Sequence, residues 1–398
     1  MPLEDLDLIL KKDPIITTWK SQSLCDNPLD VERNYLIHAR THLSLGDTER
    51  IVSTIFKWVS GKNQGAFVGA VLGDYGEGKT SFLVHVWEQS SNQNILSVPP
   101  FEWSSFDQIL SAISGWAQYK LQTTHPDLAI KVKRSFEFYR RKSIEDIAKS
   151  EATRTGGDYE AILNLYTGAL ENGTFRLASV DAKKILDFVK DITEIISPAG
   201  YKGVLVLLDE PEVAAKELGN DTVQLFIFDL ANELNLRQGN YGVFLSMPAA
   251  FYATASAKFS ALTARLQNRG CFPRLGDIYN INFAETLWKR YAEEFKLEDL
   301  SQSVVSDITL SAIGQACSSD RRDLSYGPRS VVSTFRRMVD RYKETNQPYQ
   351  PQNFIEDVLD SEIMVRPEYR TKIRTILNSP DINDSNIEAI KFFAAFPS

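Results

Sequence analysis

Hydrophobic residues along this chain recur in two patterns, which are short continuous runs and stripes with helical spacing. The clearest runs are Phe67–Leu72, Gly203–Leu208 and Gly242–Ser246, with weaker candidates at 95–98 and 277–283. Runs without polar alternation are typical of strands that are buried on both faces of a parallel sheet. Because helical patterns separate the runs, the sequence predicts an α/β fold with a parallel sheet.

Helical spacing covers most of the remaining chain. Ile51, Ile55, Phe56 and Val59 form one apolar stripe ahead of the first strong run. Residues 101–190 are helical in pattern, and helices are predicted over Phe106–Leu121, Leu128–Ser150, Tyr159–Leu170 and Val180–Ile196. After residue 285 helices are predicted over Glu285–Phe295, Leu300–Ala316 and Ser330–Glu344, until Pro348 and Pro351 bar a continuous helix.

These patterns divide the chain into four parts. We expect an N-terminal segment (1–50), a core (51–284) that carries a helical insertion at about 101–190, a helical lid (285–345) and a C-terminal helical segment (346–398). The insertion helps to separate Lys79 from Asp209 by 130 residues, more than a compact core needs between the two motifs described next.

A glycine-rich loop stands between the run at 67–72 and the helical pattern that follows it. Its residues are Gly73, Asp74, Tyr75, Gly76, Glu77, Gly78, Lys79 and Thr80, which complete the phosphate-binding pattern G-x-x-x-x-G-K-[ST]. Glycines let backbone N–H groups surround an anion, and the next helix directs the positive end of its dipole at the phosphates. We expect Lys79 to reach the β- and γ-phosphates of ATP and the Thr80 hydroxyl to bind Mg²⁺. The predicted nucleotide site runs from Gly73 to Ser81.

Two acids end the run at 203–208. A central parallel strand would deliver Asp209 and Glu210 at the carboxyl edge of the sheet, where ligands bind in such folds. Asp209 is expected to hold the Mg²⁺ shell, usually through water, and Glu210 to polarise the attacking water as the catalytic base. Alone, the pair would equally suit a core strand that ends in a solvated turn. Together with the loop, it predicts hydrolysis as well as binding.

Composition narrows the possible partners and compartments. The 398 residues are 43% hydrophobic, enough for a sizeable core, and the net charge of −8 argues against a surface that coats DNA or an anionic membrane. The N-terminus lacks a signal-peptide pattern, and no apolar run reaches the roughly 20 residues of a membrane helix. Three widely spaced cysteines are typical of free thiols in a reducing cytoplasm. His38 and His42 have helical spacing but no third ligand nearby, so a surface pair is favoured over a metal site.

One basic cluster lies within the predicted insertion. Its cations are Lys131, Lys133, Arg134, Arg140, Arg141 and Lys142, and Phe136, Phe138 and Tyr139 are interleaved with them. Cations among aromatic residues can contact the backbone of double-stranded DNA. Interspersed acids dilute the charge, however, and such a run is more commonly a solvated helix face over an apolar seam. The sequence leaves both interpretations open.

Polar and basic residues after the third strong run indicate the class of P-loop protein. Ser246 ends that run, where AAA+ proteins carry the sensor 1 residue. Arg265 and Arg269 precede the weaker strand at 277–283, where this class carries its arginine finger, and Tyr326-Gly327-Pro328-Arg329 looks like a sensor 2 motif. Over residues 51–345 the chain therefore resembles the origin-recognition and STAND-like branch of the AAA+ group. Taken singly, each of these residues also suits a strand end or a solvated helix.

The resemblance implies a P-loop NTPase sheet of the AAA+/ASCE type, a helical lid, and nucleotide sites that are completed between subunits of a homo-oligomer. An arginine finger stabilises the charge that spreads over the transferring phosphoryl group. Arg265 is preferred over Arg269 because Ala264-Arg265-Leu266-Gln267 is more similar to the Ser-Arg-Leu-Gly phrase of origin-recognition proteins.

A closer resemblance, to the ATP-binding-domain proteins of bacterial BREX-type phage defence, rests on three short phrases. These are the loop at 73–80, Ala199-Gly200-Tyr201-Lys202-Gly203 leading to the acid pair, and the phrase at 326–329. The resemblance implies a defence or DNA-transaction ATPase that works with the partner proteins of a multi-component system.

Three other classes are weighed against this one. Asp209-Glu210-Pro211-Glu212 is also a phrase of ABC and RecF-like ATPases, but residues 174–202 hold no S-G-G-Q-like signature. A STAND-type switch, in which nucleotide state gates assembly and turnover is slow, would carry the same motifs. A GTPase is disfavoured because no N-K-x-D motif occurs. The sequence favours a cytoplasmic, Mg²⁺-dependent ATPase that couples nucleotide state to oligomer assembly on DNA or on a partner protein.

Overall fold

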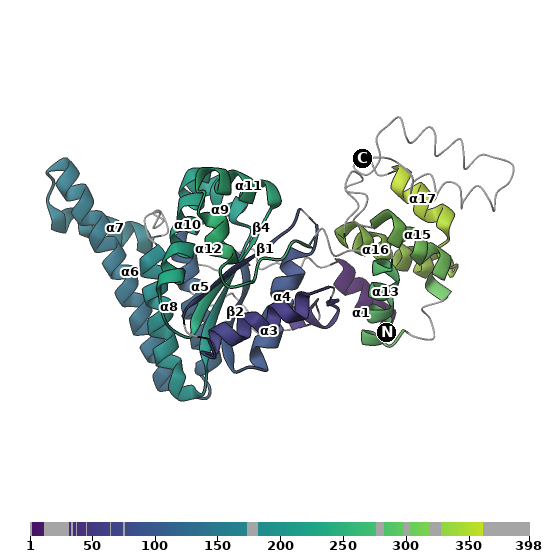
Figure 1. Cartoon of the computed structure of the whole chain (residues 1–398), viewed down its shortest axis with the longest axis horizontal. Helices are drawn as coiled ribbons and strands as arrows, with labels where there is room; N and C mark the ends of the chain where they lie inside the picture. Colours follow the sequence, from purple (N-terminus) through teal and green to yellow (C-terminus); the bar gives the residue numbers. More distant parts are fainter. Residues whose placement is uncertain are drawn as a thin grey trace.

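Four parallel strands form the centre of the molecule, with helices on both sides of the sheet (Figure 1). The computed structural model describes residues 2–11, 32, 35–36, 38–44, 46–63, 65–74, 76–172, 182–275, 282–297, 303–317 and 328–360. The strands are β1 (Phe67–Leu72), β2 (Ile95–Glu102), β3 (Gly203–Asp209) and β4 (Tyr241–Met247). Nearly every strand residue is buried, as continuous apolar runs predict.

The strands lie in the order β1-β4-β3-β2, so β4 separates the strand before the glycine-rich loop from the strand that ends in the acid pair. Residues 271–274 run along the free side of β1, where the Ala70 N–H donates to the Cys271 carbonyl at 3.0 Å and Leu72 forms a parallel bridge with Arg274. The weaker predicted strand, 277–283, lies outside the described residues up to 281. Its last residue, Phe283, begins a helix, so the prediction of a strand there was wrong at that end.

Because neighbouring strands are parallel, each connection must cross from one edge of the sheet to the other, and these crossovers carry the covering helices. The connection from β1 to β2 passes through α4 (Lys79–Ser91), and α3 (Thr48–Val59) also contacts β1, β3 and β4. The returning connections pass on the opposite face through α5 (Phe106–Leu121), α8 (Ala182–Ile196), α9 (Pro211–Leu218) and α10 (Asn220–Leu236), and then α11 (Ala249–Lys258) and α12 (Leu262–Gln267). All four strands therefore end at the same edge of the sheet, which is its carboxyl edge, and begin at the opposite, amino edge.

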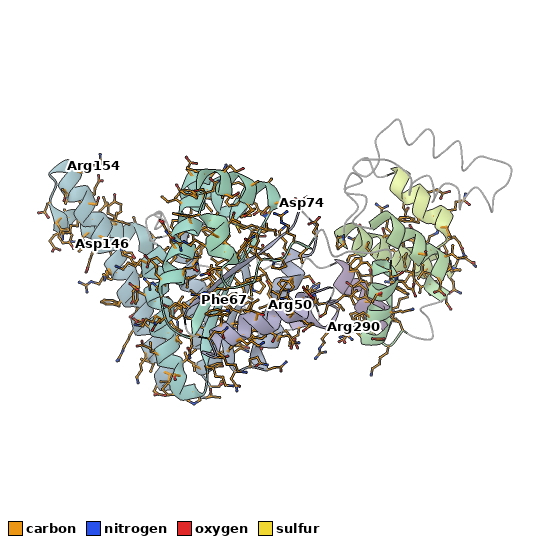
Figure 2. All side chains as sticks on the ribbon, in the orientation of Figure 1. Arg50, Phe67, Asp74, Asp146, Arg154 and Arg290 are labelled. Atoms are coloured by element: carbon orange, nitrogen blue, oxygen red, sulfur yellow. The ribbon has the colours of Figure 1, made fainter. Side chains whose placement is uncertain are left out.

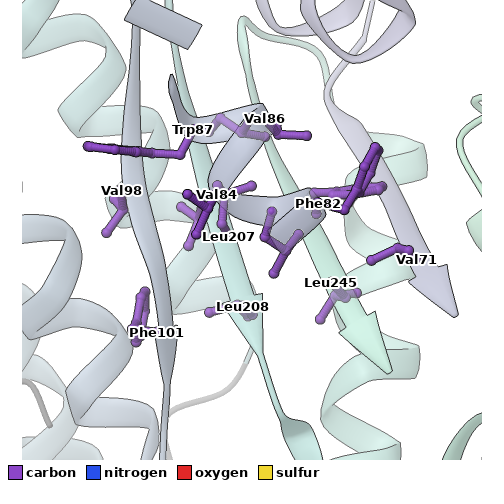
Figure 3. Close-up of a cluster of buried hydrophobic side chains, with 14 of the residues drawn as sticks. Val71, Phe82, Val84, Val86, Trp87, Val98, Phe101, Leu207, Leu208 and Leu245 are labelled. Atoms are coloured by element: carbon purple, nitrogen blue, oxygen red, sulfur yellow. The ribbon is translucent and has the colours of Figure 1, made fainter. Parts of the chain in front are cut away.

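A dense apolar core joins α4 to the sheet. Phe82, Val84 and Val86 of α4 are buried together with Leu207 and Leu245 of the central strands (Figure 3). A fully buried side chain of this size stabilises a protein by about 1.5–3 kcal/mol. The first turn of α4, which carries Lys79 and Thr80, is thus attached to a rigid base.

A helical arm extends from the opposite face of the sheet. It consists of α6 (Pro126–Thr155), which packs on α5 and α8, and α7 (Tyr159–Glu171), which packs on α6. Figure 2 shows Arg154 close to the free end of this arm. Because α5 and α8 contact β2 and β3 directly, two of the four helices between residues 101 and 196 cover the sheet.

A second group of helices follows the sheet in sequence and includes the N-terminus in space. It contains α13 (Phe283–Glu294), α15 (Asp307–Cys317), α16 (Pro328–Thr345) and α17 (Pro351–Asp360). α1 (Pro2–Lys11) packs on α16, and Lys343 Nζ lies 2.7 Å from Asp7 Oδ2. The break between α16 and α17 falls at the predicted prolines. We call α1, α13, α15, α16 and α17 the helical unit. Within the described ranges, no helix has the length and apolar character needed to cross a membrane.

Candidate active site

The glycine-rich loop joins β1 to α4 at the carboxyl edge of the sheet. Gly76 and Gly78 have φ angles of 84° and 81°, which a residue with a Cβ rarely adopts, and Gly78 is the N-cap of α4. No side chain caps this helix. Its first backbone N–H groups and the positive end of its dipole are therefore directed at the loop, which suits an anion. Tyr75 lies outside the described residues.

Lys79 is buried, and its ammonium group is held by the loop itself. Its Nζ donates to the carbonyl oxygens of Gly73 and Asp74, both at 3.0 Å. The Asp74 N–H in turn donates to Glu77 Oε2 at 2.7 Å. The single buried cation of the loop is thus bonded to neutral acceptors within it.

Asp209 collects hydrogen bonds from three separate segments. Thr80 Oγ1 donates to Asp209 Oδ2 at 2.6 Å, the Ser246 hydroxyl donates to Oδ1, and the Glu210 N–H also donates to Oδ1 at 3.1 Å. Burial raises the pKa of the Asp209 carboxyl, while the hydrogen bonds and the charge of Lys79 oppose that rise. Residues 80, 209 and 246, which the sequence assigned to one site, therefore meet at one carboxylate.

Glu210 and Glu212 follow directly. Glu210 is the N-cap of α9 with φ 49° and ψ 61°, a left-handed conformation that costs a non-glycine residue on the order of 1 kcal/mol. Burial raises the pKa of Glu212, and the charges of Glu210 and Asp209 add to the rise. Glu212 Oε2 is buried without a hydrogen-bond partner among the described residues. In the sequence, Glu212 stands out only as part of the phrase at 209–212, which was the available signal for a third carboxyl group.

The two candidate finger arginines lie at the other edge of the sheet. Arg265 is exposed on α12, and its carbonyl accepts a hydrogen bond from Asn235 Nδ2 at 3.0 Å. Asn235 lies in the last turn of α10, shortly before the amino end of β4. The Arg269 guanidinium lies 4.1 Å from the centre of the Trp58 ring, just before β1. Neither arginine is brought together with the Asp209 cluster of its own chain. Arg329 lies in the first turn of α16, and its side chain is outside the described residues.

The predicted basic cluster divides between two sides of α6. Lys131, Lys133, Arg134, Arg141 and Lys142 are exposed, and two of them, Lys133 and Arg141, pair with Glu137 and Glu145 one turn away. The Arg140 side chain is 19% exposed and faces Asp107 of α5, with 3.9 Å between Nε and Oδ1. Arg140 is therefore a contact between α6 and α5, and the other five cations form a solvated face.

The prediction of a surface pair was wrong for His42, because its ring is covered by His85 and by the first turn of α4. His42 Nδ1 lies 3.1 Å from Ser81 Oγ, and the His42 ring stacks on that of His85 with 4.4 Å between ring centres. Burial lowers the pKa of His42 to about 3, and the charge of His85 contributes to the shift. His42 is therefore neutral near pH 7. Its contact with Ser81 spans 39 positions, and no local pattern signals it.

Comparisons with known proteins add little to this geometry. No protein-family model and no curated protein matches the chain. Among solved structures, it is similar to Cdc6p from Pyrobaculum aerophilum, with TM-score 0.47 and 13% identity over 89% of this chain and 81% of that chain. It is also similar to the ORC2 protein from Aeropyrum pernix, determined as ADPNP–ADP complexes, with TM-score 0.45 and 13% identity over the same shares. Likenesses this distant assign neither a family nor an activity.

The class of fold follows from the chain's own sheet and loop. A parallel sheet, a glycine-rich loop between β1 and α4, and a carboxylate at the end of β3 that meets the loop threonine define an α/β P-loop NTPase fold. The additional helices form the arm and the helical unit.

Proposed function

We propose that this protein is a Mg²⁺-dependent ATPase of the AAA+ type whose nucleotide state controls its assembly. The observation that carries the proposal is the 2.6 Å hydrogen bond between Thr80 and Asp209, which are 129 positions apart in the chain. A chance glycine turn would have no reason to lie against a buried carboxylate at the end of another strand. The same contact supports a shared site for a metal ion and phosphates.

The donor groups at this edge fit a triphosphate with Mg²⁺. Hydroxyl and carboxylate oxygens, as on Thr80 and Asp209, are the ligands that Mg²⁺ prefers, usually with water between some of them. The bound ion would neutralise charge on the phosphate oxygens. The left-handed glycines and the uncapped start of α4 supply N–H groups to the phosphates, and Lys79 exchanges its two loop carbonyls for phosphate oxygens.

Hydrolysis requires a base beside this cradle. In the proposed reaction a water oxygen bonds to the γ-phosphorus, the bond from that phosphorus to the bridging oxygen breaks, and ADP and phosphate leave. Glu210 accepts the proton of the attacking water, and Ser246 orients the Asp209 carboxylate. The position of Glu210, at the N-cap of α9 directly after Asp209, supports this assignment.

Assembly is the second part of the proposal. Arg265 is exposed, far from its own Asp209 cluster, and suits an arginine that completes the site of a neighbouring copy. Arg329, at the start of α16, is proposed to act as a sensor 2 residue from the helical unit. We also propose that the assembled ATPase works with partner proteins in bacterial phage defence and acts on DNA or on those partners. The short sequence phrases given above support this part of the proposal.

Two measurements test the proposal. Phosphate release from ATP should require Mg²⁺ and stop in EDTA, whereas an absence of turnover with intact binding would favour a slow STAND-type switch. Size measurements in the apo, ADP and ATP-analogue states should reveal larger particles with the analogue.

A separate experiment with duplex DNA tests the exposed cations of α6. Reversing the charges of Lys131 and Arg134 should flatten the salt dependence of any DNA binding.

A further inference from the structure

A segment of the N-terminal region crosses the first turn of α4. We call residues 38–44 the strap. Its His42 places Nδ1 3.1 Å from the hydroxyl oxygen of Ser81, the residue that follows Thr80. Since Thr80 binds Asp209 from the same helical turn, the strap contacts the back of the turn whose front forms the candidate nucleotide site.

The His42 ring is held from several sides. It stacks on His85 with 19° between the ring planes, and it lies against Phe82 with 6.3 Å between ring centres. His85 Nε2 is 3.0 Å from Glu49 Oε1, and Glu49 also accepts a hydrogen bond from Ser44 of the strap. His42 Nε2 is buried without a hydrogen-bond partner among the described residues. The ring therefore makes its one described polar contact through Nδ1.

The strap also binds the helical unit. Arg290 Nε of α13 donates to the Arg40 carbonyl at 2.8 Å, and Arg40 Nη1 lies 3.3 Å from Glu294 Oε1. Figure 2 shows Arg290 in the part of the helical unit nearest the sheet. Arg40 thus contacts α13 and His42 contacts α4, and the two residues are only two positions apart.

We propose that His42 is a positioning residue of the nucleotide site, which holds Ser81 and the first turn of α4 in the orientation that binds phosphate. The inference rests on the proposed function, because it assigns a task to His42 only if α4 binds a nucleotide. When Nδ1 carries the ring proton, it donates to Ser81 and leaves the serine hydroxyl proton for a phosphate oxygen. The strap makes this turn sensitive to the position of α13.

The nitrogen, and not the ring, is the feature to remove. His42→Phe keeps the packing against His85 and Phe82 but loses the bond to Ser81, whereas His42→Asn keeps a polar atom near the place of Nδ1. Ser81→Ala removes the other partner. His125→Asn is the matched control, because the His125 ring lies at the start of the arm and has its one described hydrogen bond to the neighbouring Thr124.

The experiment is equilibrium binding of a fluorescent, non-hydrolysable ATP analogue to the full chain, with urea midpoints as a check on folding. We expect His42→Phe and Ser81→Ala each to weaken binding about three- to tenfold, as the loss of one hydrogen bond does. The double variant should be no worse than Ser81→Ala alone, since that variant already removes the bond to His42. His42→Asn and His125→Asn should stay within about twofold of wild type. In steady state, KM should rise in His42→Phe while kcat changes little.

Equal affinity of wild type and Ser81→Ala would overturn the inference, and this variant decides the case even if His42→Phe fails to fold. Additive losses in the double variant would also overturn it, because the two residues would then act separately. A wild-type chain that binds no nucleotide would instead overturn the proposed function. Binding that Lys79→Ala abolishes and His42→Phe leaves unchanged would refute only the inference.

Discussion

The amino and carboxyl edges of the sheet both carry charged side chains, but these side chains are bonded differently at the two edges. At the amino edge the half-buried Arg237 lies 2.6 Å from Asp187, and the guanidinium of the half-buried Arg269 lies over the Trp58 ring. At the carboxyl edge, Asp209 accepts bonds from hydroxyls and a backbone N–H, and within the described ranges it forms no ion pair. Lys79 is likewise bonded to carbonyl oxygens.

The difference separates residues that stabilise the fold from residues that can still bind a ligand. A cation paired with a carboxylate is already neutralised, and one that lies over an aromatic ring already has a favourable contact, so each gains little from a new partner. A buried carboxylate held mainly by hydroxyls is only partly compensated, and burial raises its pKa. Such a group gains strongly when a cation arrives. Changes to the partnered cations and close backbone contacts of the amino edge should therefore lower stability, and changes at the carboxyl edge should lower nucleotide binding or turnover.

Lys79→Ala should have the largest effect at the carboxyl edge. It removes the buried cation of the loop while leaving the sheet intact, so ATP binding should fall below detection and turnover with it. Calorimetric titration with ATP and Mg²⁺ measures the loss. The urea midpoint should change little, and unaltered ATP affinity would refute the assigned phosphate site.

Glu210→Gln should leave binding and remove chemistry. The amide has the shape of the carboxylate but accepts no proton, so turnover should fall by about a thousandfold while ATP stays bound. Single-turnover phosphate release measures the change. Wild-type turnover would exclude Glu210 as the base and direct attention to Glu212, whose buried Oε2 has no described partner.

Arg265→Ala and Arg269→Ala form a matched pair at the amino edge. Arg265→Ala should bind nucleotide normally but hydrolyse it at least about a hundredfold more slowly and assemble less well, because its guanidinium serves a neighbouring copy. Arg269→Ala should keep turnover and lose on the order of 1 kcal/mol of stability with its ring contact. The opposite result would make Arg269 the finger.

A mixing experiment tests the geometry between subunits. Mixed oligomers of Arg265→Ala and Glu210→Gln contain some interfaces with both residues intact, so ATPase activity should partly recover. Demonstrated mixed oligomers without recovery would count against Arg265 acting on a neighbour.

Gly203→Ala should break the amino edge without touching the site. A Cβ there would lie 2.2 Å from the Val59 carbonyl oxygen and 2.3 Å from the Asn240 carbonyl oxygen, both rigid backbone atoms. We expect a loss of about 3 kcal/mol or more in unfolding free energy, by urea denaturation. The folded fraction should bind ATP with wild-type affinity. Gly200→Ala, with no heavy atom within 4 Å of its added Cβ but a φ of 88°, should cost less.

The smallest expected effect is on the stability of the folded protein at acidic pH. The folded-state pKa of His42, about 3, lies below the ordinary value of 6.5, so between these values the unfolded chain binds a proton that the folded chain does not. This contribution to stability is complete above pH 6.5 and falls as the pH drops towards 3. His42→Asn should reduce the loss between pH 7.5 and pH 5 by on the order of 1 kcal/mol, measured by urea midpoints. An identical pH dependence would contradict the burial of a neutral ring.

The sheet was largely predictable because its strands are buried on both faces and so leave a plain sequence signal. β2 was predicted only over 95–98, since Pro99 and Pro100 argue against a strand. The strand continues to Glu102 because β2 lies at the edge of the sheet and its register shifts between Val98 and Phe101. α6 extends beyond its predicted range of 128–150 because Pro126 suits a first helical turn and Gly156 adopts the left-handed C-cap.

The candidate site was predictable where chain position dictates geometry. Thr80 follows β1, Asp209 ends β3 and Ser246 lies near the end of β4, so parallel strands must bring them to one edge. The functional assignments of these residues stay predictions. The contact between His42 and Ser81 was not predictable, because it depends on how a segment outside the sheet packs across α4.

The packing of α1 on α16 has a consequence for synthesis. Asp7 and Lys343 form their ion pair across 336 positions, so α1 can pack on α16 only after nearly all of the described chain has been made. At about 5–20 residues per second, that interval lasts tens of seconds. During this time α1, whose Leu6 and Leu10 are buried in the finished protein, lacks its packing on α16. Chaperone binding to nascent chains should therefore include α1, although it lies far from every motif that defines the protein.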